Sequence, residues 1–286
     1  MMLEIAEKNL PSKRQWMFME WSGTAMFAYF DETGTHGDQA PITAVAGYLF
    51  SESGAELFRQ MFQENVYPLL PSDRHGNKIY HSHKCIGGYD QFANLTPLER
   101  EHIVTLLVEA INKSITVGVV LVLPKEASAD AIDRAPGLKS LAGDAYSQCL
   151  IRCIEYMAEW LDDESVSEQV DYIFEAGCIY QKEANRIFEK IAALEELKAR
   201  YHWHSYSFCK KSAESPQLFA PDLLAWEWQR AHINAMNPHC KEWRLTLKTL
   251  FAGSPHIPRY LTSTSVGIRA IINAFYGLTT YIKEEH

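Results

Sequence analysis

Apolar residues in this chain form short continuous runs and longer stretches with turn spacing, and the two patterns alternate. The continuous runs are rich in β-branched and aromatic side chains, which suit a pleated surface, so they predict strands. Strands are expected at residues 26–30, 43–50, 78–85, 116–123, 170–174 and 203–208. The second is expected to pair with the first as a hairpin. The fourth has almost no polar residue, so it is expected to be central.

The longer stretches repeat apolar residues every three or four positions, as a helix with one buried face does. Helices are expected at residues 54–70, 143–161, 181–200, 218–233 and 266–281. Another is expected to begin after Thr96, because Pro97 suits a first turn and Glu99 occupies the capping-box position. Residues 124–140 are expected to be a polar excursion.

Strands that alternate with helices predict an α/β fold, in which helices cover a mixed sheet with parallel members. Residues 1–24 are expected to be an N-terminal arm. Residues 25–286 are expected to be one domain with insertions and a C-terminal helical extension, because no repeat or obvious linker interrupts them.

The composition narrows the class of protein. Of 286 residues, 47% are hydrophobic and 12% aromatic, which supports a real core and argues against disorder. The net charge of −9 weighs against a nucleic-acid binder, since phosphate contacts draw on Lys and Arg. An acidic metal site would explain part of that charge, because a bound ion offsets its ligands.

Six cysteines occur without a CxxC pair, and no stretch reaches the ~18 apolar residues of a spanning helix. Residues 1–19 lack the apolar region of a signal peptide. We therefore expect a cytoplasmic protein without disulfides or membrane association. Cys149 and Cys153 are expected to pack in the core, and the oligomeric state stays open.

Two predicted strands each end in acidic residues followed by a glycine. Asp31 and Glu32 follow the run 26–30, and Glu175 follows the run 170–174. Acids at the end of a buried strand are costly unless a cation compensates them. The alternative is ordinary turn chemistry before Gly34 and Gly177, since acids of this kind also favour turns.

Ligands in α/β sheets sit beyond the carboxyl ends of parallel strands. If these two strands are parallel neighbours, about 4.8 Å apart, Asp31 and Glu175 can share one cation. Strand alternation puts Asp31 and Glu32 on opposite faces, which favours Asp31 as the ligand of the two.

A third acid, Asp222, lies in an otherwise apolar helical segment with Leu218 and Trp226 on its face. A charge there is costly unless it is paired or metal-bound. The alternative is that Pro221 opens the helix and Asp222 complements the helix dipole.

Histidines offer a second type of site. His81 and His83 share one face of a predicted strand, as do His202 and His204, so four imidazoles would converge on zinc if those strands were adjacent. The alternative is that they are surface residues. His81 or His83 is also placed for proton transfer or substrate binding, and His36, in a glycine loop, for substrate contact.

Nucleic acid as a partner has weak support from charge. The nearest approach to a basic rim consists of Arg74, His75, Lys78, Lys210 and Lys211.

Two motifs resemble those of the uncharacterised family called domain of unknown function 3800. The sequence Tyr29-Phe30-Asp31-Glu32-Thr33-Gly34-Thr35 resembles its Asp-Glu-Ser-Gly opening, and the helix 217–225 resembles its Gln-Leu-Ala-Asp-Leu-Leu-Ala signature. His81-Ser82-His83 stands where the family often has an aromatic-His element. The resemblance spans residues 25–230, with Thr33 in place of Ser and Pro221 in place of Ala.

This resemblance implies a ribonuclease H-like fold and a metal-dependent nuclease. It implies that Asp31, Glu175 and Asp222 bind two Mg²⁺ or Mn²⁺ ions, with Glu32 as a fourth ligand. One ion would activate water and the other would stabilise the leaving oxygen. The competing reading is a non-catalytic, partner-binding subunit with a degenerate fold of this type.

Overall fold

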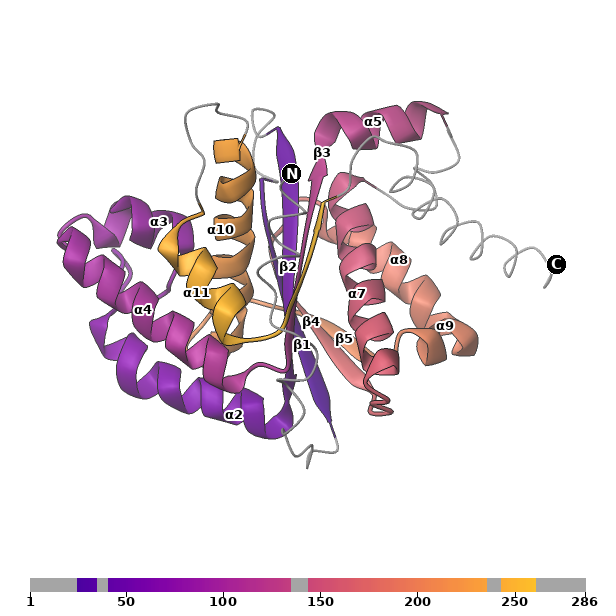
Figure 1. The fold of residues 1–286 in the computed structure, drawn as a ribbon, viewed down its shortest axis with the longest axis horizontal. Coiled ribbons are helices and arrows are strands. Elements are labelled where there is room, and N and C mark those ends of the chain that lie inside the picture. The colour runs from indigo at the N-terminus through magenta and orange to yellow at the C-terminus, as the bar shows by residue number, and fades with distance from the viewer. Residues whose placement is uncertain (1–24, 35–40, 135–143, 236–242, 261–286) are drawn as a thin grey trace.

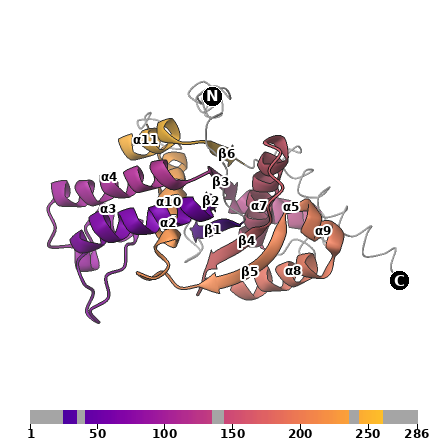
Figure 2. The same cartoon turned by 90° about the horizontal axis from the view of Figure 1, so that it is seen from below.

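The computed structural model describes residues 25–34, 41–134, 144–235 and 243–260, and these build one sheet with helices on both faces (Figures 1 and 2). The strands are β1 (Met26–Thr33), β2 (Ile42–Ser51), β3 (Val117–Pro124), β4 (Val170–Glu175), β5 (Trp203–Cys209) and β6 (His256–Tyr260). The helices are α2 (Glu52–Met61), α3 (Ser82–Gly87), α4 (Pro97–Ser114), α5 (Lys125–Arg134), α7 (Ala145–Asp163), α8 (Gln181–Ala193), α9 (Glu195–Arg200), α10 (Phe219–Ala235) and α11 (Leu245–Gly253).

The six strands form a mixed sheet in the order β5-β4-β1-β2-β3-β6. Strand β1 pairs antiparallel with its hairpin partner β2 and parallel with β4, and β5 extends the parallel half. The expected α/β class is therefore confirmed. The carboxyl ends of β1, β4 and β5 come to the same edge of the sheet, which is where a ligand site is expected.

Alternate residues of β1 enter two different cores. Met26, Ala28 and Phe30 pack with α7 and α8 on one face. Phe27 and Tyr29 pack against the core of α2, α4, α10 and α11 on the other. Strand β3 is buried almost throughout, because β2 and β6 flank it and helices cover both its faces. Its predicted central place is confirmed.

The predicted capping box at Thr96 is also confirmed. The Thr96 hydroxyl accepts a hydrogen bond from the Glu99 amide at 3.3 Å, and the Glu99 carboxylate accepts one from the Thr96 amide at 2.7 Å. These bonds satisfy backbone donors that the first turn of α4 would otherwise leave unpaired.

Three predictions about elements were wrong, and two further elements were not predicted. The expected strand at 78–85 is irregular as far as His81 and then becomes α3. The expected helix at 181–200 is two helices, because the backbone turns extended at Leu194. Part of the polar excursion forms α5, and α11 and β6 were not foreseen because their segments are short and weakly periodic.

Within the described residues, no helix is long and apolar enough to cross a membrane. Five of the six cysteines fall in that part of the chain and all five are free thiols; Cys149 and Cys153 pack in the core as expected. The predicted arm at 1–24 and the predicted helix at 266–281 lie outside the described residues.

Candidate metal centre

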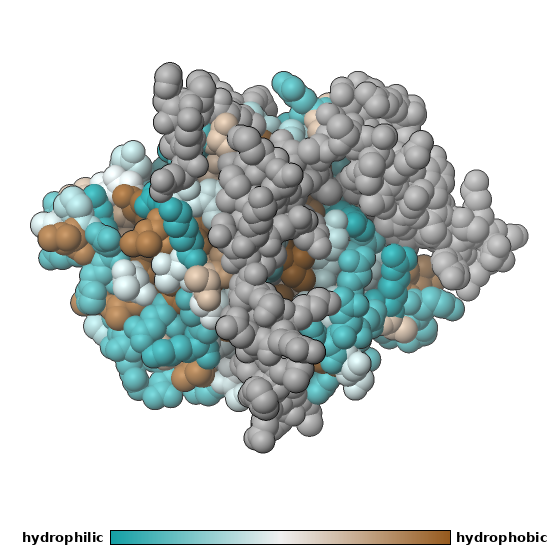
Figure 3. Space-filling view, in the orientation of Figure 1, coloured by the Kyte–Doolittle hydropathy of each residue, from teal (hydrophilic) through white to brown (hydrophobic). Residues whose placement is uncertain are grey.

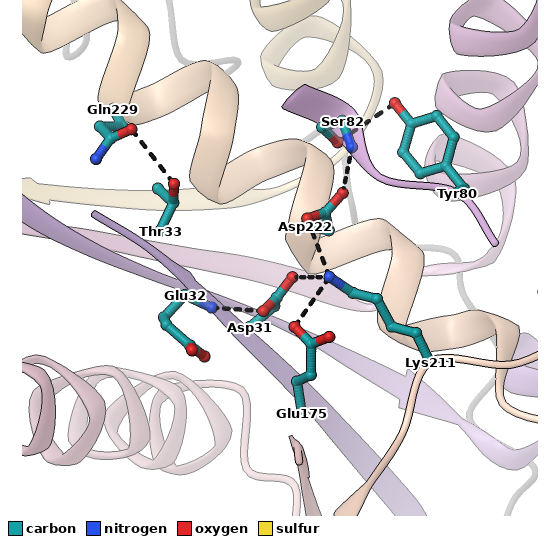
Figure 4. Close-up of polar contacts among 9 residues, drawn as sticks. All are labelled: Asp31, Glu32, Thr33, Tyr80, Ser82, Glu175, Lys211, Asp222 and Gln229. Carbon is teal, nitrogen blue, oxygen red and sulfur yellow. Dashed lines mark hydrogen bonds and ion pairs between the residues drawn. The ribbon is translucent and has the colours of Figure 1, made fainter. Parts of the chain in front are cut away.

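Three carboxylates from distant parts of the chain meet around one ammonium group (Figure 4). The Nζ atom of Lys211 lies 2.6 Å from Asp31 Oδ2, 2.9 Å from Glu175 Oε2 and 3.0 Å from Asp222 Oδ1. The Lys211 side chain is only 4% exposed, so these are buried ion pairs rather than surface ones. The predicted convergence of residues 31, 175 and 222 is observed, and the cation at its centre is a lysine.

Pairing of the strands places the first two acids. Phe30 of β1 lies opposite Phe174 of β4 in the parallel register, so the next residues, Asp31 and Glu175, emerge side by side at the edge of the sheet. Asp31 does not belong to a turn, as its alternative interpretation required. It remains in β1, opposite Ala46 of β2.

Asp222 reaches the same point from the first turn of α10, which packs across β1 and β2. Pro221 is tolerated because it also lies in that first turn, where backbone N–H groups lack helical partners. Lys211 follows the end of β5, so it too arrives from the carboxyl edge of the parallel half of the sheet.

Glu32 stands on the opposite face of β1 yet remains part of the acidic group. One carboxylate oxygen from each of Asp31, Glu32 and Glu175 lies within 4.8 Å of the other two. Strand alternation favoured Asp31 over Glu32 as a ligand, but it does not exclude Glu32. The two carboxylates leave opposite faces of β1, and both come close to Glu175.

Two effects dominate the pKa values of the clustered acids: burial raises them, and the positive charge of Lys211 lowers them. Burial raises the pKa of Asp31 well above its usual range, in spite of Lys211, and a hydrogen bond with Glu175 adds to the rise. Burial also acts on Glu175, but its hydrogen bond with Asp31 and the Lys211 ammonium outweigh it and lower the pKa of Glu175. Asp31 and Glu175 thus form a pair that favours one shared proton.

The other charged groups of the cluster follow the same logic. For Asp222, the Lys211 ammonium overcomes burial and lowers the pKa, while burial raises the pKa of Glu32 to about 7. Burial opposes the charge of Lys211, but the surrounding carboxylates hold its pKa well above its ordinary value. Lys211 is therefore a permanent cation in this structure.

A shell of hydrogen bonds braces the site (Figure 4). The Ser82 amide donates to Asp222 Oδ2 at 2.6 Å, which fixes the start of α3 against α10. The Ser82 hydroxyl donates to Tyr80 at 3.3 Å. On the other side, the Thr33 hydroxyl donates to Gln229 of α10 at 3.3 Å, which holds the end of β1.

The four histidines do not converge, so the condition for a zinc site, adjacent strands that carry them, is not met. His81 and His83 flank the start of a helix instead of sharing a strand face. His202 and His204 pair instead with Asp162 and Asp171, at 2.9 and 2.8 Å. No group of three potential metal ligands among the described residues includes a histidine.

His81 is the histidine of this group whose pKa responds to the charges of the cluster. It is half-buried; burial lowers its pKa, and the charges of Asp222, Lys211 and Glu175 also act on it. His83 is exposed and stacks on Tyr89. His36 lies outside the described residues.

Lys211 is the site residue that sequence reasoning misplaced, because it was assigned to an exposed basic rim. Lys210 is exposed, whereas Lys211 is buried among the acids. A signal was present in the sequence: the two lysines follow a predicted strand directly, just as Glu175 follows another. Charged residues at the ends of parallel strands share an edge, whatever their sign.

The donor set suits a hard divalent cation. Asp31, Glu32, Glu175 and Asp222 offer only carboxylate oxygens, which Mg²⁺ and Mn²⁺ prefer over the nitrogen and sulfur ligands of zinc sites. Their combined charge exceeds that of the single ammonium beside them. Among the described residues, Asp31, Glu32 and Glu175 bring their oxygens close enough together to hold one ion, and Asp222 faces Asp31 and Glu175 across the Lys211 ammonium.

A separate groove of about 850 Å³ lies between α4 and α11. In the space-filling view, hydrophobic and hydrophilic side chains are interspersed on the side of the molecule that carries these helices (Figure 3). Its lining mixes Val104 and Val108 with Arg100, Lys113 and Arg244, and it contains none of the clustered carboxylates. The chemistry-bearing residues are therefore not in this groove.

No protein-family model and no curated protein matches this chain. The case for a function consequently depends on the geometry of the carboxylate cluster.

Proposed function

We propose that this chain is a metal-dependent phosphodiesterase of ribonuclease H-like architecture that acts on nucleic acid. The observation that supports it is the meeting of Asp31, Glu175 and Asp222, from three separate elements, at one buried cation position. The strand order, with β2 antiparallel to its neighbours, is consistent with that architecture.

Asp31, Glu32, Glu175 and Asp222 would hold the metal. A Mg²⁺ or Mn²⁺ pair bound there supplies an activated water and charge stabilisation at the leaving oxygen. The chain itself supplies rigid positioning: Asp31 and Glu175 are set by the strand register, and Asp222 by its bond from the Ser82 amide. Fixed ligands of this kind lower the reorganisation that the reaction requires.

His81 is the residue suited to move a proton. It precedes Ser82, whose amide bonds Asp222, and the charges of Asp222 and Lys211 act on its ring, so the imidazole lies near the cluster. Burial lowers its pKa, which keeps the ring neutral and able to accept a proton at neutral pH.

The test combines calorimetry with an activity assay. Titration of the protein with Mn²⁺ should show binding, and labelled single- and double-stranded DNA and RNA should be cleaved only with the metal. Asp31→Asn should abolish both signals, because it removes a charged ligand at nearly constant volume. Glu101→Gln, an exposed acid on α4, is the matched control and should behave like wild type. Cleavage that persists in Asp31→Asn would refute the proposal.

One observation favours the second candidate, a non-catalytic partner-binding subunit. Lys211 already compensates part of the negative charge without any metal. Under that reading the cluster is a structural ion-pair network, Mn²⁺ produces no heat of binding, and no nucleic acid is cleaved.

A further inference from the structure

A stacked pair of aromatic rings lies at the surface next to the carboxylate cluster. The rings of His83 and Tyr89 have centroids 5.2 Å apart and an interplanar angle of 29°. His83 is exposed, and Tyr89 is 54% exposed. We call His83 and Tyr89 the aromatic platform. Its two stacked rings expose apolar surface to water.

The platform is held in shape by the backbone. Gly88 adopts a φ of +69° and ends α3, and the Tyr89 amide donates to the Lys84 carbonyl at 2.9 Å, which folds the chain back over the helix. A Cβ atom at Gly87 would lie 2.2 Å from the Tyr89 ring. Only glycine at position 87 therefore allows Tyr89 to occupy its place against the helix.

The platform adjoins the candidate metal centre directly. The Ser82 amide lies 2.6 Å from Asp222 Oδ2, and His83 is the next residue along the chain. Adjacent Cα atoms are about 3.8 Å apart, so the platform begins within one residue of the cluster. The first amide of α3 thus contacts the cluster, and the two platform residues lie on and just after this same short helix.

Positive charge accompanies the rings. Lys84 pairs with Asp90 at 2.9 Å, and this bond, with the nearby charges of His83 and Arg74, holds the pKa of Asp90 below its usual range. Lys210, which precedes the buried Lys211 in the chain, is exposed. The salt bridge to Asp90 offsets part of the charge of Lys84, and the exposed Lys210 adds a further positive charge that attracts phosphates to a chain whose net charge is negative.

We propose that the His83–Tyr89 platform stacks an unpaired base of a single-stranded nucleic acid whose phosphate lies at the carboxylate cluster. This inference rests on the proposed function and deepens it by naming single strands as the substrate class. Bases in a duplex are already stacked and paired, whereas an unpaired base presents its π-face to an aromatic ring, whatever its sequence.

The experiment measures binding of a fluorescently labelled oligothymidylate by anisotropy, with Ca²⁺ in place of Mg²⁺ or Mn²⁺, because Ca²⁺ offsets the carboxylates but lacks the strict octahedral geometry of Mg²⁺, so that the strand stays intact. Tyr89→Ala should weaken binding by about tenfold, the order expected for the loss of one base–aromatic stack. Tyr89→Phe keeps the ring and should bind like wild type. Gly87→Ala keeps the tyrosine at position 89 but displaces its ring. Its affinity for the strand should therefore be close to that of Tyr89→Ala. Leu98→Ala, at a 76% exposed residue on α4, is the control for surface change.

Two further measurements separate this inference from the proposed function. An abasic strand should bind wild type and Tyr89→Ala equally, and Mn²⁺ should bind both equally by calorimetry. Equal oligothymidylate affinity for wild type and Tyr89→Ala, in a protein that cleaves with Mn²⁺, would overturn the platform and leave the phosphodiesterase standing. Wild type that neither binds Mn²⁺ nor cleaves would overturn the phosphodiesterase itself.

Discussion

Two buried clusters of charged residues in this molecule differ in their ratio of acidic to basic side chains. On α7, Glu155 pairs with Arg152 and, at 3.8 Å, with the more exposed Arg200, and it accepts a hydrogen bond from the Tyr201 hydroxyl at 3.3 Å, so acids are not in excess there. At the edge of the sheet, three acids meet the single ammonium of Lys211. The central side chains of the two clusters, Glu155 and Lys211, are 2% and 4% exposed, so burial does not distinguish them.

The difference in balance separates a structural ion pair from a candidate site. A matched pair satisfies its own charges and needs nothing further. An excess of buried carboxylates must either take up protons, as the raised pKa of Asp31 indicates, or bind another cation. Charge excess at the carboxyl edge of the sheet is therefore the feature that points to ligand binding.

The largest effect is expected from removal of the lysine in the unbalanced cluster. Lys211→Met leaves the acids without their ammonium, so the free energy of unfolding in metal-free buffer should fall by about 3–5 kcal/mol. Saturating Mn²⁺ should restore more stability to this variant than to wild type, because the ammonium no longer competes with the ion. Urea denaturation with and without Mn²⁺ measures both, and Lys210→Met is the matched control. Equal stabilisation of Lys211→Met and wild type by Mn²⁺ would contradict the competition.

The balanced cluster should respond differently to the same treatment. Arg152→Met leaves the buried Glu155 with the longer, 3.8 Å pair to Arg200 and the bond from Tyr201, and should lower the free energy of unfolding by about 3 kcal/mol at most. Mn²⁺ should not rescue this variant beyond its effect on wild type. The double variant Arg152→Met with Glu155→Gln should recover much of the loss, since neither buried charge remains. Rescue of the single variant by Mn²⁺ would remove the distinction between the two clusters.

A lone buried acid provides an intermediate case. Burial raises the pKa of Glu227 to about 7 against the pull of Arg244, whose Nε lies 3.4 Å away. Between pH 4.5, its ordinary pKa, and about 7, the unfolded chain releases this proton and the folded chain keeps it, so stability falls as the pH rises. The two pKa values differ by about 2.5, which corresponds to about 3 kcal/mol.

Glu227→Gln should remove this pH dependence. The variant should match wild type near pH 4.5 and exceed its free energy of unfolding by about 2–3 kcal/mol at pH 8. Denaturant titrations at the two pH values give the difference directly. A variant that is less stable than wild type at pH 8 would show that the pair with Arg244 outweighs the cost of burial.

The smallest effect on stability is expected at the residue that matters most for the proposed activity. Asp31→Asn replaces an acid whose pKa is already raised well above its usual range, so metal-free stability should change by less than about 1 kcal/mol. Thermal denaturation tests this, alongside the loss of Mn²⁺ binding. A loss as large as that of Lys211→Met would place Asp31 in a structural network instead.

Local pattern was sufficient for much of the architecture. Residues 26–30 and 170–174 form strands, as their β-branched and aromatic side chains predict. The capping box at Thr96 starts α4 through neighbouring residues alone. Predictions failed where a segment is short, or where contacts with distant residues determine its conformation. Residues 78–85 alternate like a strand, yet Ser82 to Gly87 form a helix whose first amide bonds Asp222, 140 residues away.

The acids at 31, 175 and 222 were recognisable from sequence because a charge at the end of an apolar run is costly anywhere in a fold. What the sequence by itself determined was therefore which residues carry unusual charge. Only the tertiary structure decided that they meet, that Glu32 joins them from the other face, and that Lys211 lies between them. The physical reason is that strand register and helix packing set distances between residues far apart in the chain, and no local pattern records those distances.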